Sequence, residues 1–251
     1  PSRGWVPDLD QLDSLVTPST RAIVVIDPNN PTGATYPQPV RKALVSFIER
    51  HGLAMLADEV YADLAFDGPV APIGAFDPDA AVISFSSLSK GYMAPGWRTG
   101  WLAVGRSPRL NEALQAVKKL ADARLCSTVP MEHAIKAALT GDRSHQVRFR
   151  AALKERAAVT TEHLSRVPGM TCVAPNAAFY AFPKVTLPPG RTDEDYVIAL
   201  LRATGVLCVH GSGFGMPPAE GYLRVVFLAS PDELAEVYRL MAGFTADYIR
   251  T

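Results

Sequence analysis

Polar residues that could do chemistry follow the first two buried strands predicted in this sequence. The turn at residues 27–33, with the sequence DPNNPTG, holds Asn30 between two prolines, and its amide can both donate and accept hydrogen bonds. After the next strand comes Asp58, followed three residues later by Tyr61. A carboxylate with a nearby phenol suits the binding of a cationic ring nitrogen. Taken singly, the first motif is equally consistent with a plain tight turn, and the second favours a solvated strand end.

A serine-rich segment follows the third predicted strand and leads to a lysine. Ser87 and Ser89 stand three and one residues before Lys90, and Arg98 follows eight residues after it. Hydroxyl and guanidinium groups bind anions, and a lysine beside them can form a Schiff base. By itself this segment is also consistent with a surface loop. Because chemistry gathers at the carboxyl ends of parallel strands, the three motifs together predict a site for pyridoxal phosphate (PLP).

Apolar runs that alternate with helical patterns position these motifs. Four short apolar runs predict strands, and an apolar face spaced as on a helix predicts a helix that Gly52 ends. Strands joined through a helix favour parallel pairing, whereas the connection from Phe85 to Gly100 has no helical period and is expected to be a functional loop. A capping box at Ser230 predicts the start of the last helix. We expect strands at 22–26, 53–57, 81–85, 100–104, 171–173, 178–182, 206–209 and 222–228, helices near 40–48, 108–122, 130–140 and 143–166, and a loop at 183–191.

The composition argues against several classes of protein. Lysine plus arginine and aspartate plus glutamate number 25 each, which gives no basic surplus for binding nucleic acid. The three cysteines are widely spaced without a CxxC pair, and the five histidines lack ligand spacing, so we expect no disulfide framework and no metal site. No apolar run is long enough for a membrane span, and no secretory segment opens the chain. We therefore expect a cytoplasmic protein.

In their fixed order these motifs resemble the fold-type I, PLP-dependent aminotransferases of classes I and II. The resemblance implies an α/β fold in which residues 1–144 form an incomplete large domain with a mostly parallel sheet. Residues 145–251 would form a smaller α+β C-terminal domain. The segments at 123–130 and 178–184 are most like the alanine aminotransferase branch. The matching motifs are DPNNPTG at 27–33, ADEVY at 57–61, SLSK at 87–90, PGWRTGW at 95–101, VHGSGFG at 209–215 and YLRV at 222–225.

The resemblance implies roles around the ring of the cofactor. Lys90 would hold PLP as a Schiff base and afterwards move the substrate proton. Asp58 would pair with the ring nitrogen. Asn30 and Tyr61 would form hydrogen bonds with the O3′ oxygen of the ring, and Asn30 would also bind substrate.

The resemblance also implies two sets of anion-binding residues. Ser87 and Arg98, with Ser89, would bind the phosphate of PLP. Arg224 would bind the α-carboxylate of the substrate in a bidentate pair that lysine could not reproduce. An inward-facing arginine in a strand is costly without an anionic partner, which favours this role. Arg124 is expected either to reach a substrate or to lie on the surface.

The sequence departs from the family at His210, where proline is common, and at its front. The N-terminal arm, a phosphate-binding turn and a ring-stacking aromatic residue are missing, so we expect a fragment or a chain completed by another segment. The predicted activity moves an amino group between a small neutral amino acid such as alanine and a 2-oxo acid such as 2-oxoglutarate, in a homodimer. A PLP-dependent β-lyase, and a non-catalytic or ligand-sensing domain, are the alternatives.

Overall fold

The computed structural model describes residues 1–250 and divides them into two compact units. The sheet unit contains residues 6–28 and 35–149. The C-terminal unit contains residues 1–5, 29–34 and 150–250. The change of unit at residue 150 lies inside the helix α5 (Ser144–Leu164), where the sequence also suggested a boundary. The expected boundary between the large and the small domain, between residues 144 and 145, stays a prediction.

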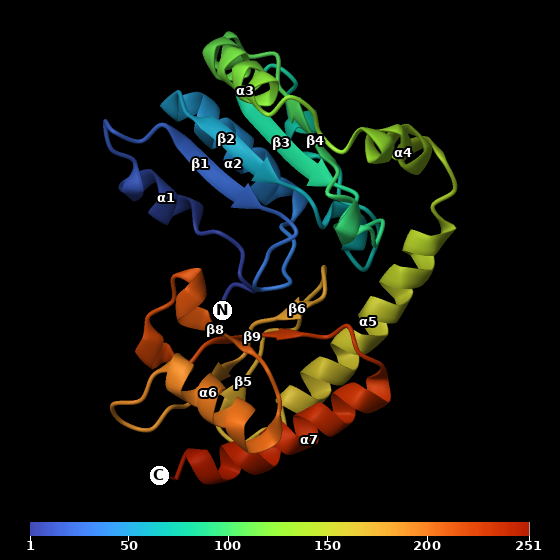
Figure 1. Ribbon diagram of the computed structural model, residues 1–251. Helices are drawn as coiled ribbons and strands as arrows, with labels where there is room; N and C mark the ends of the chain where they lie inside the picture. Colours follow the sequence, from blue (N-terminus) through green and yellow to red (C-terminus); the bar gives the residue numbers. More distant parts are fainter. Residues whose placement is uncertain (251) are drawn as a thin grey trace. The chain divides into compact units, whose positions relative to one another are not determined.

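A four-stranded sheet in the order β1-β2-β3-β4 forms the centre of the sheet unit (Figure 1). The first three strands are parallel, and β4 is antiparallel to β3 because the loop that joins them contains no crossover helix. The sequence therefore predicts a mostly parallel α/β sheet correctly. Its strands are β1 (Ala22–Ile26), β2 (Ala54–Asp58), β3 (Val82–Ser87) and β4 (Gly100–Val104).

One face of this sheet is covered by the helix α2 (Gln38–His51), whose Leu44 and Ile48 pack against Met55 and Val82. The helix ends at Gly52, which has a left-handed φ of 65° and donates its N–H to the carbonyl of Ile48. This confirms the predicted stop. Two further helices of the unit bury no residue, namely α3 (Asn111–Ala123) and α4 (Val129–Thr140).

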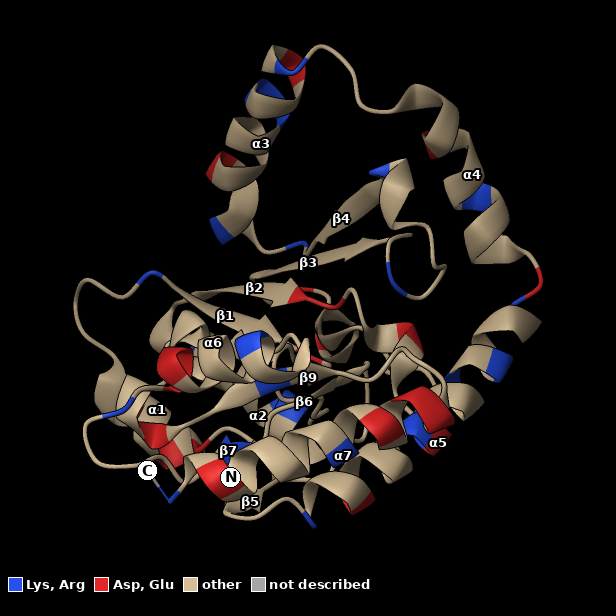
Figure 2. Cartoon of the chain, turned by 60° about the horizontal axis from the view of Figure 1, so that its bottom comes forward, with Lys and Arg blue, Asp and Glu red and all other residues tan. Residues whose placement is uncertain are grey.

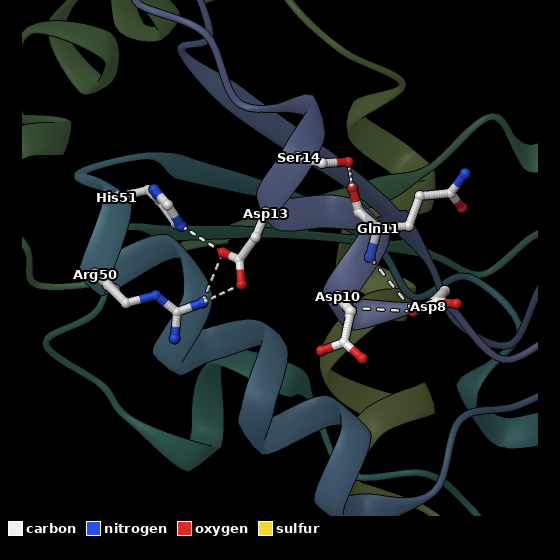
Figure 3. Close-up of polar contacts among 7 residues, drawn as sticks. All are labelled: Asp8, Asp10, Gln11, Asp13, Ser14, Arg50 and His51. Atoms are coloured by element: carbon white, nitrogen blue, oxygen red, sulfur yellow. Dashed lines mark hydrogen bonds and ion pairs between the residues drawn. The ribbon is translucent and has the colours of Figure 1, made fainter.

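A short helix that the sequence did not predict, α1 (Leu9–Leu15), is bound to the end of α2 by polar contacts (Figure 3). Asp13 accepts hydrogen bonds from Arg50 at 2.9 Å and pairs with His51 at 2.7 Å. Asp8 caps the first turn by accepting from the N–H of Asp10 at 3.2 Å. The seven residues of α1 make about two turns, too few for an apolar periodicity that could be recognised from sequence.

The C-terminal unit combines two small antiparallel sheets with three helices. In its three-stranded sheet, β9 lies between β6 and β8, and β5 pairs with β7. The strand β7 lies within residues 183–191, so the expectation of an uninterrupted loop there was wrong, because pairing with β5 orders its first residues. The other expected strands exist but are shorter. They are β5 (Met170–Thr171), β6 (Tyr180–Ala181), β8 (Val209–His210) and β9 (Leu223–Val226), whereas the strand that was not expected is β7 (Lys184–Val185).

Helix packing holds the C-terminal unit together. Helices α5 and α7 (Pro231–Tyr248) lie side by side, and the hydroxyls of Thr160 and Tyr238 are 2.9 Å apart between them (Figure 1). Tyr196 of α6 (Asp193–Thr204) reaches Thr245 of α7 at 2.7 Å. The predicted capping box at Ser230 is confirmed by its bond from the N–H of Glu233. Within residues 1–250, no helix has both the length and the apolar character needed to cross a bilayer.

Candidate active site

Asp58 is the only charged residue in the four strands of the sheet unit, as Figure 2 shows by their otherwise uncoloured ribbons. It ends β2, and one of its carboxylate oxygens accepts the N–H of Val60 at 3.2 Å. Because side chains alternate along a strand, Asp58 points away from the face that α2 covers. A half-buried carboxylate with a single backbone donor keeps the capacity to accept from a cationic ligand group, which makes this position a candidate ligand site.

The face that carries Asp58 is hollowed. A cavity of about 410 Å³ is lined by Asp58 and Ser87 together with the apolar side chains of Val24, Leu56 and Phe85. The register places Phe85 opposite Asp58, so Ser87 lies one side-chain repeat further along the same face of the sheet. Val24 is 66% exposed, although it belongs to the apolar strand β1 at the edge of the sheet. The structure thus brings an acid and a hydroxyl together on an open apolar surface.

Lys90 lies in the loop that follows β3, with its Nζ 5.8 Å from the ring centre of Tyr61. Tyr61 is buried, so its ring forms a fixed wall beside the amine of Lys90. The hydroxyl of Ser87 accepts the N–H of Ser89 at 3.2 Å, and this bond closes the turn before the lysine. The predicted pair of lysine and tyrosine is therefore close in space.

Arg98 differs from the other predicted phosphate ligands because it is exposed. Its guanidinium donates to the carbonyl of Pro95 at 2.9 Å, and its backbone has a left-handed φ of 53°. The guanidinium of Arg98 thus contacts the backbone of the turn that carries it, and its role as a phosphate ligand stays a prediction. Arg124, at the end of α3, is also exposed.

The remaining two predicted site residues belong to the C-terminal unit. Arg224 of β9 donates through Nη1 to the side-chain oxygen of Asn30 at 2.8 Å. Its guanidinium carbon lies 4.8 Å from the ring centres of both Tyr180 and Phe214. Its Nε is buried without a hydrogen-bond partner, and no carboxylate of residues 1–250 pairs with it. A carboxylate ligand would satisfy this group, whereas an unpaired buried donor is costly.

The turn that carries Asn30 is rigid. Asn29 accepts the hydroxyl of Thr32 at 2.8 Å, and the N–H of Gly33 donates to the carbonyl of Asn29 at 2.9 Å. Asn30 is thus presented to Arg224 by a turn with hydrogen bonds of its own, in which Asn29 accepts from Thr32 and Gly33.

Two contributors to the arginine site were missed in the sequence. Tyr180 and Phe214 lie inside motifs that matched the family, but no role was assigned to either. The one feature of the sequence that could have indicated them is that both are aromatic, because an aromatic ring beside a guanidinium stabilises the cation. Only the folded structure shows which rings reach Arg224. No group of three or more histidine, cysteine or acidic residues suited to a metal occurs within residues 1–250.

Comparison with known proteins decides the family. The model of the aminotransferases of class I and II matches residues 1–239. The chain belongs to the class I and II aminotransferase family. It is 36% identical over 253 residues to an alanine aminotransferase of Mycobacterium tuberculosis, covering 98% of this chain and 59% of the relative. It is also 36% identical to the glutamate-pyruvate aminotransferase AlaA of Haemophilus influenzae, covering 97% of this chain and 62% of the relative.

Solved structures agree with this assignment. The alanine aminotransferase from Pyrococcus furiosus superposes with a TM-score of 0.92 and 34% identity, over 98% of this chain and 63% of that one. This confirms fold type I, the fold predicted from the motifs. The chain therefore spans about three fifths of the length of the relatives it matches.

Proposed function

We propose that this protein is a PLP-dependent aminotransferase that moves an amino group from a small neutral amino acid such as alanine to a 2-oxo acid such as 2-oxoglutarate. The observation that carries the proposal is the isolated carboxylate of Asp58 in one hollow with Ser87, three residues before Lys90. The names of the relatives, alanine and glutamate-pyruvate aminotransferases, support the choice of substrates.

The donor set of the site fits PLP. An amine, a carboxylate, hydroxyls and a guanidinium match the aldehyde, the ring nitrogen and the phosphate of this cofactor. Lys90 would hold its aldehyde carbon and Asp58 its protonated ring nitrogen. Asn30 and Tyr61 would bind its ring oxygen. The phosphate would be bound by Ser87, Ser89 and Arg98.

When bound, PLP supplies an electron sink that makes the Cα–H bond of the substrate acidic. The protein's own groups then direct the reaction. The Nζ of Lys90 would accept the α-proton of the substrate as a general base and return it as a general acid. Arg224 binds the α-carboxylate through its planar fork and so fixes which bond of the α-carbon is aligned for cleavage.

The proposal includes a homodimer in the cytoplasm. Leu120 of α3 is 72% exposed and Leu125, between α3 and α4, is 92% exposed. A second copy of the chain would bury this apolar surface. Widely spaced, unpaired cysteines suit a reducing compartment. Sedimentation equilibrium of the purified chain measures the assembly directly, and a monomer at all concentrations contradicts it.

The experiment that tests the function joins a covalent readout to a product assay. In one sample the chain is incubated with PLP, reduced with borohydride and mapped by mass spectrometry. In a second sample, which is not reduced, the chain with PLP is supplied with L-alanine and 2-oxoglutarate. We expect an adduct on Lys90 and equal amounts of pyruvate and glutamate. Lys90→Ala should lose both, whereas Lys42→Ala, which changes a lysine of the helix α2 on the other face of the sheet, should lose neither.

Two results would overturn the proposal. Pyruvate that forms together with ammonia, without glutamate, would indicate a β-lyase instead. Absence of both an adduct and products would show that the chain is not a catalyst, as expected of a ligand-sensing or inactive form.

A further inference from the structure

The loop that contains Phe214 is fixed by a buried carboxylate. Asp193, the first residue of α6, has no exposed surface. Its Oδ2 accepts the backbone N–H of Ser212 at 2.5 Å, and its Oδ1 accepts the hydroxyl of Ser212 at 3.0 Å. A third donor, the N–H of Glu194, reaches Oδ1 at 2.9 Å. No ion pair compensates this carboxylate among residues 1–250, so its stability depends on these donors.

Capping of α6 does not account for Asp193. The start of this helix is already closed by a capping box, in which the hydroxyl of Thr192 accepts the N–H of Asp195 and the carboxylate of Asp195 accepts the N–H of Thr192. Asp193 instead directs both carboxylate oxygens to a residue of a different segment. Two of its three hydrogen bonds therefore hold the loop after β8, and only the bond from the N–H of Glu194 lies within the helix.

The same hydroxyl connects the loop to a histidine. The Nδ1 of His210 lies 2.8 Å from the Oγ of Ser212. Because that hydroxyl has one hydrogen and donates it to Asp193, the Nδ1 of His210 must be the donor in this second bond. The chain of bonds from Asp193 through Ser212 to His210 holds the loop from both sides.

Phe214 is two residues beyond this anchor, and its ring lies 4.8 Å from the guanidinium carbon of Arg224. A short helical turn, Gly211–Phe214, spans the interval, and the N–H of Gly211 donates to the carbonyl of Tyr222 at 2.7 Å. Because the start of the turn is bonded at Gly211 and Ser212 and the Phe214 ring also lies 6.0 Å from the ring of Phe182, the ring has little freedom to leave the arginine. Arg224 would otherwise lose considerable rotamer entropy when it binds a ligand.

We propose that Phe214 is a positioning residue for carboxylate recognition, and that Asp193 holds it over Arg224 through Ser212. This inference rests on the proposed function, because it takes Arg224 to bind the α-carboxylate of an amino acid or 2-oxo acid. The ring keeps the guanidinium fork in its bound orientation before the ligand arrives. Loss of the ring should therefore weaken carboxylate binding without changing the chemical step.

The test compares matched pairs of substitutions. Phe214→Leu removes the ring over Arg224, and Phe244→Leu removes a half-buried phenylalanine of the same unit that packs against Tyr196 and no cation. Asp193→Asn weakens the anchor, and Asp195→Asn removes an equal charge from the same helical turn. Phe214→Tyr keeps the ring and should restore binding.

Two readouts need no turnover. The first is the Nε–H signal of Arg224 in protein with ¹⁵N-labelled arginine, assigned through Arg224→Lys, and the second is the affinity for propionate, a three-carbon monocarboxylate. Phe214→Leu should weaken propionate binding about tenfold and speed the exchange of this Nε–H. Asp193→Asn should act in the same direction by about fivefold. If Asp193→Asn does not fold, Ser212→Ala keeps the backbone bond and tests the hydroxyl alone.

With substrates, Phe214→Leu should raise KM about tenfold and leave kcat within about twofold. The inference is overturned if Phe214→Leu leaves propionate affinity and the Arg224 signal unchanged, or if Phe244→Leu produces equal losses. If propionate binding follows the expected pattern while no transamination occurs, the proposed function fails and the positioning role stands.

Discussion

Substitution of Gly33 by alanine tests how the asparagine-bearing turn is locked into the C-terminal unit. Gly33 has a left-handed φ of 69°, and a Cβ placed on it would lie 2.1 Å from the carbonyl oxygen of Tyr180 and 2.6 Å from the Cβ of Pro175. The carbonyl of Gly33 also accepts the N–H groups of Asn176 and Ala177, at 3.0 and 2.9 Å. A side chain here must therefore displace backbone on both sides.

Gly205 provides the matched control. It belongs to the same unit, has a φ of 77°, and a Cβ on it would meet nothing within 4 Å. The left-handed conformation costs both alanine variants about 1–2 kcal/mol. Overpacking adds about 1–3 kcal/mol to Gly33→Ala alone, and each lost backbone hydrogen bond adds about 1 kcal/mol. We expect Gly33→Ala to destabilise the unit by about 2–4 kcal/mol more than Gly205→Ala.

Urea unfolding followed by Trp5 fluorescence measures this difference. Trp5 lies 5.6 Å from the ring of Phe182 in the C-terminal unit, and replacing Trp97 and Trp101 by phenylalanine removes the signal of the sheet unit. The reasoning is refuted if the two alanine variants unfold with free energies within about 0.5 kcal/mol of one another.

Two further predictions concern buried titratable groups. Burial raises the pKa of Glu59, with opposing contributions that include the bond from the N–H of Ile73, so the folded state favours its protonated form. Protonated Glu59 stabilises the folded wild type, and this contribution is lost as pH rises above about 4. Glutamine does not titrate, so the unfolding free energy of Glu59→Gln minus that of wild type should increase between about pH 4 and pH 8. Urea unfolding at each pH measures both free energies, and a difference between variant and wild type that does not change with pH would contradict this prediction. Among the cysteines, exposed Cys126 should react first with iodoacetamide, because burial raises the pKa of Cys172 to about 11 and of Cys208 to about 12. Peptide mapping against time checks the order, and early alkylation of Cys208 would show that its surroundings open.

Local pattern explains why much of the sheet unit could be predicted. The run at residues 22–26 became β1 with the same bounds, and the second and third strands moved by one or two residues only. Glycine at the end of α2 and the capping box of α7 follow from backbone geometry within a few residues. The short strands of the C-terminal unit were less accurate because their ends depend on partners and not on their own residues.

By itself, the sequence determined which chemical groups stand at the strand ends and in what order. Asp58, Ser87 and Lys90 follow runs whose apolar character is local, so their positions after β2 and β3 needed no tertiary information. Only the tertiary structure decided that Arg224 bonds to Asn30, 194 residues away, and that Phe214 lies over its guanidinium. It likewise decided that Asp193 anchors Ser212. These contacts join segments that are distant in sequence, and no periodicity within one segment encodes them, because they form only when packing of the whole unit brings the segments together.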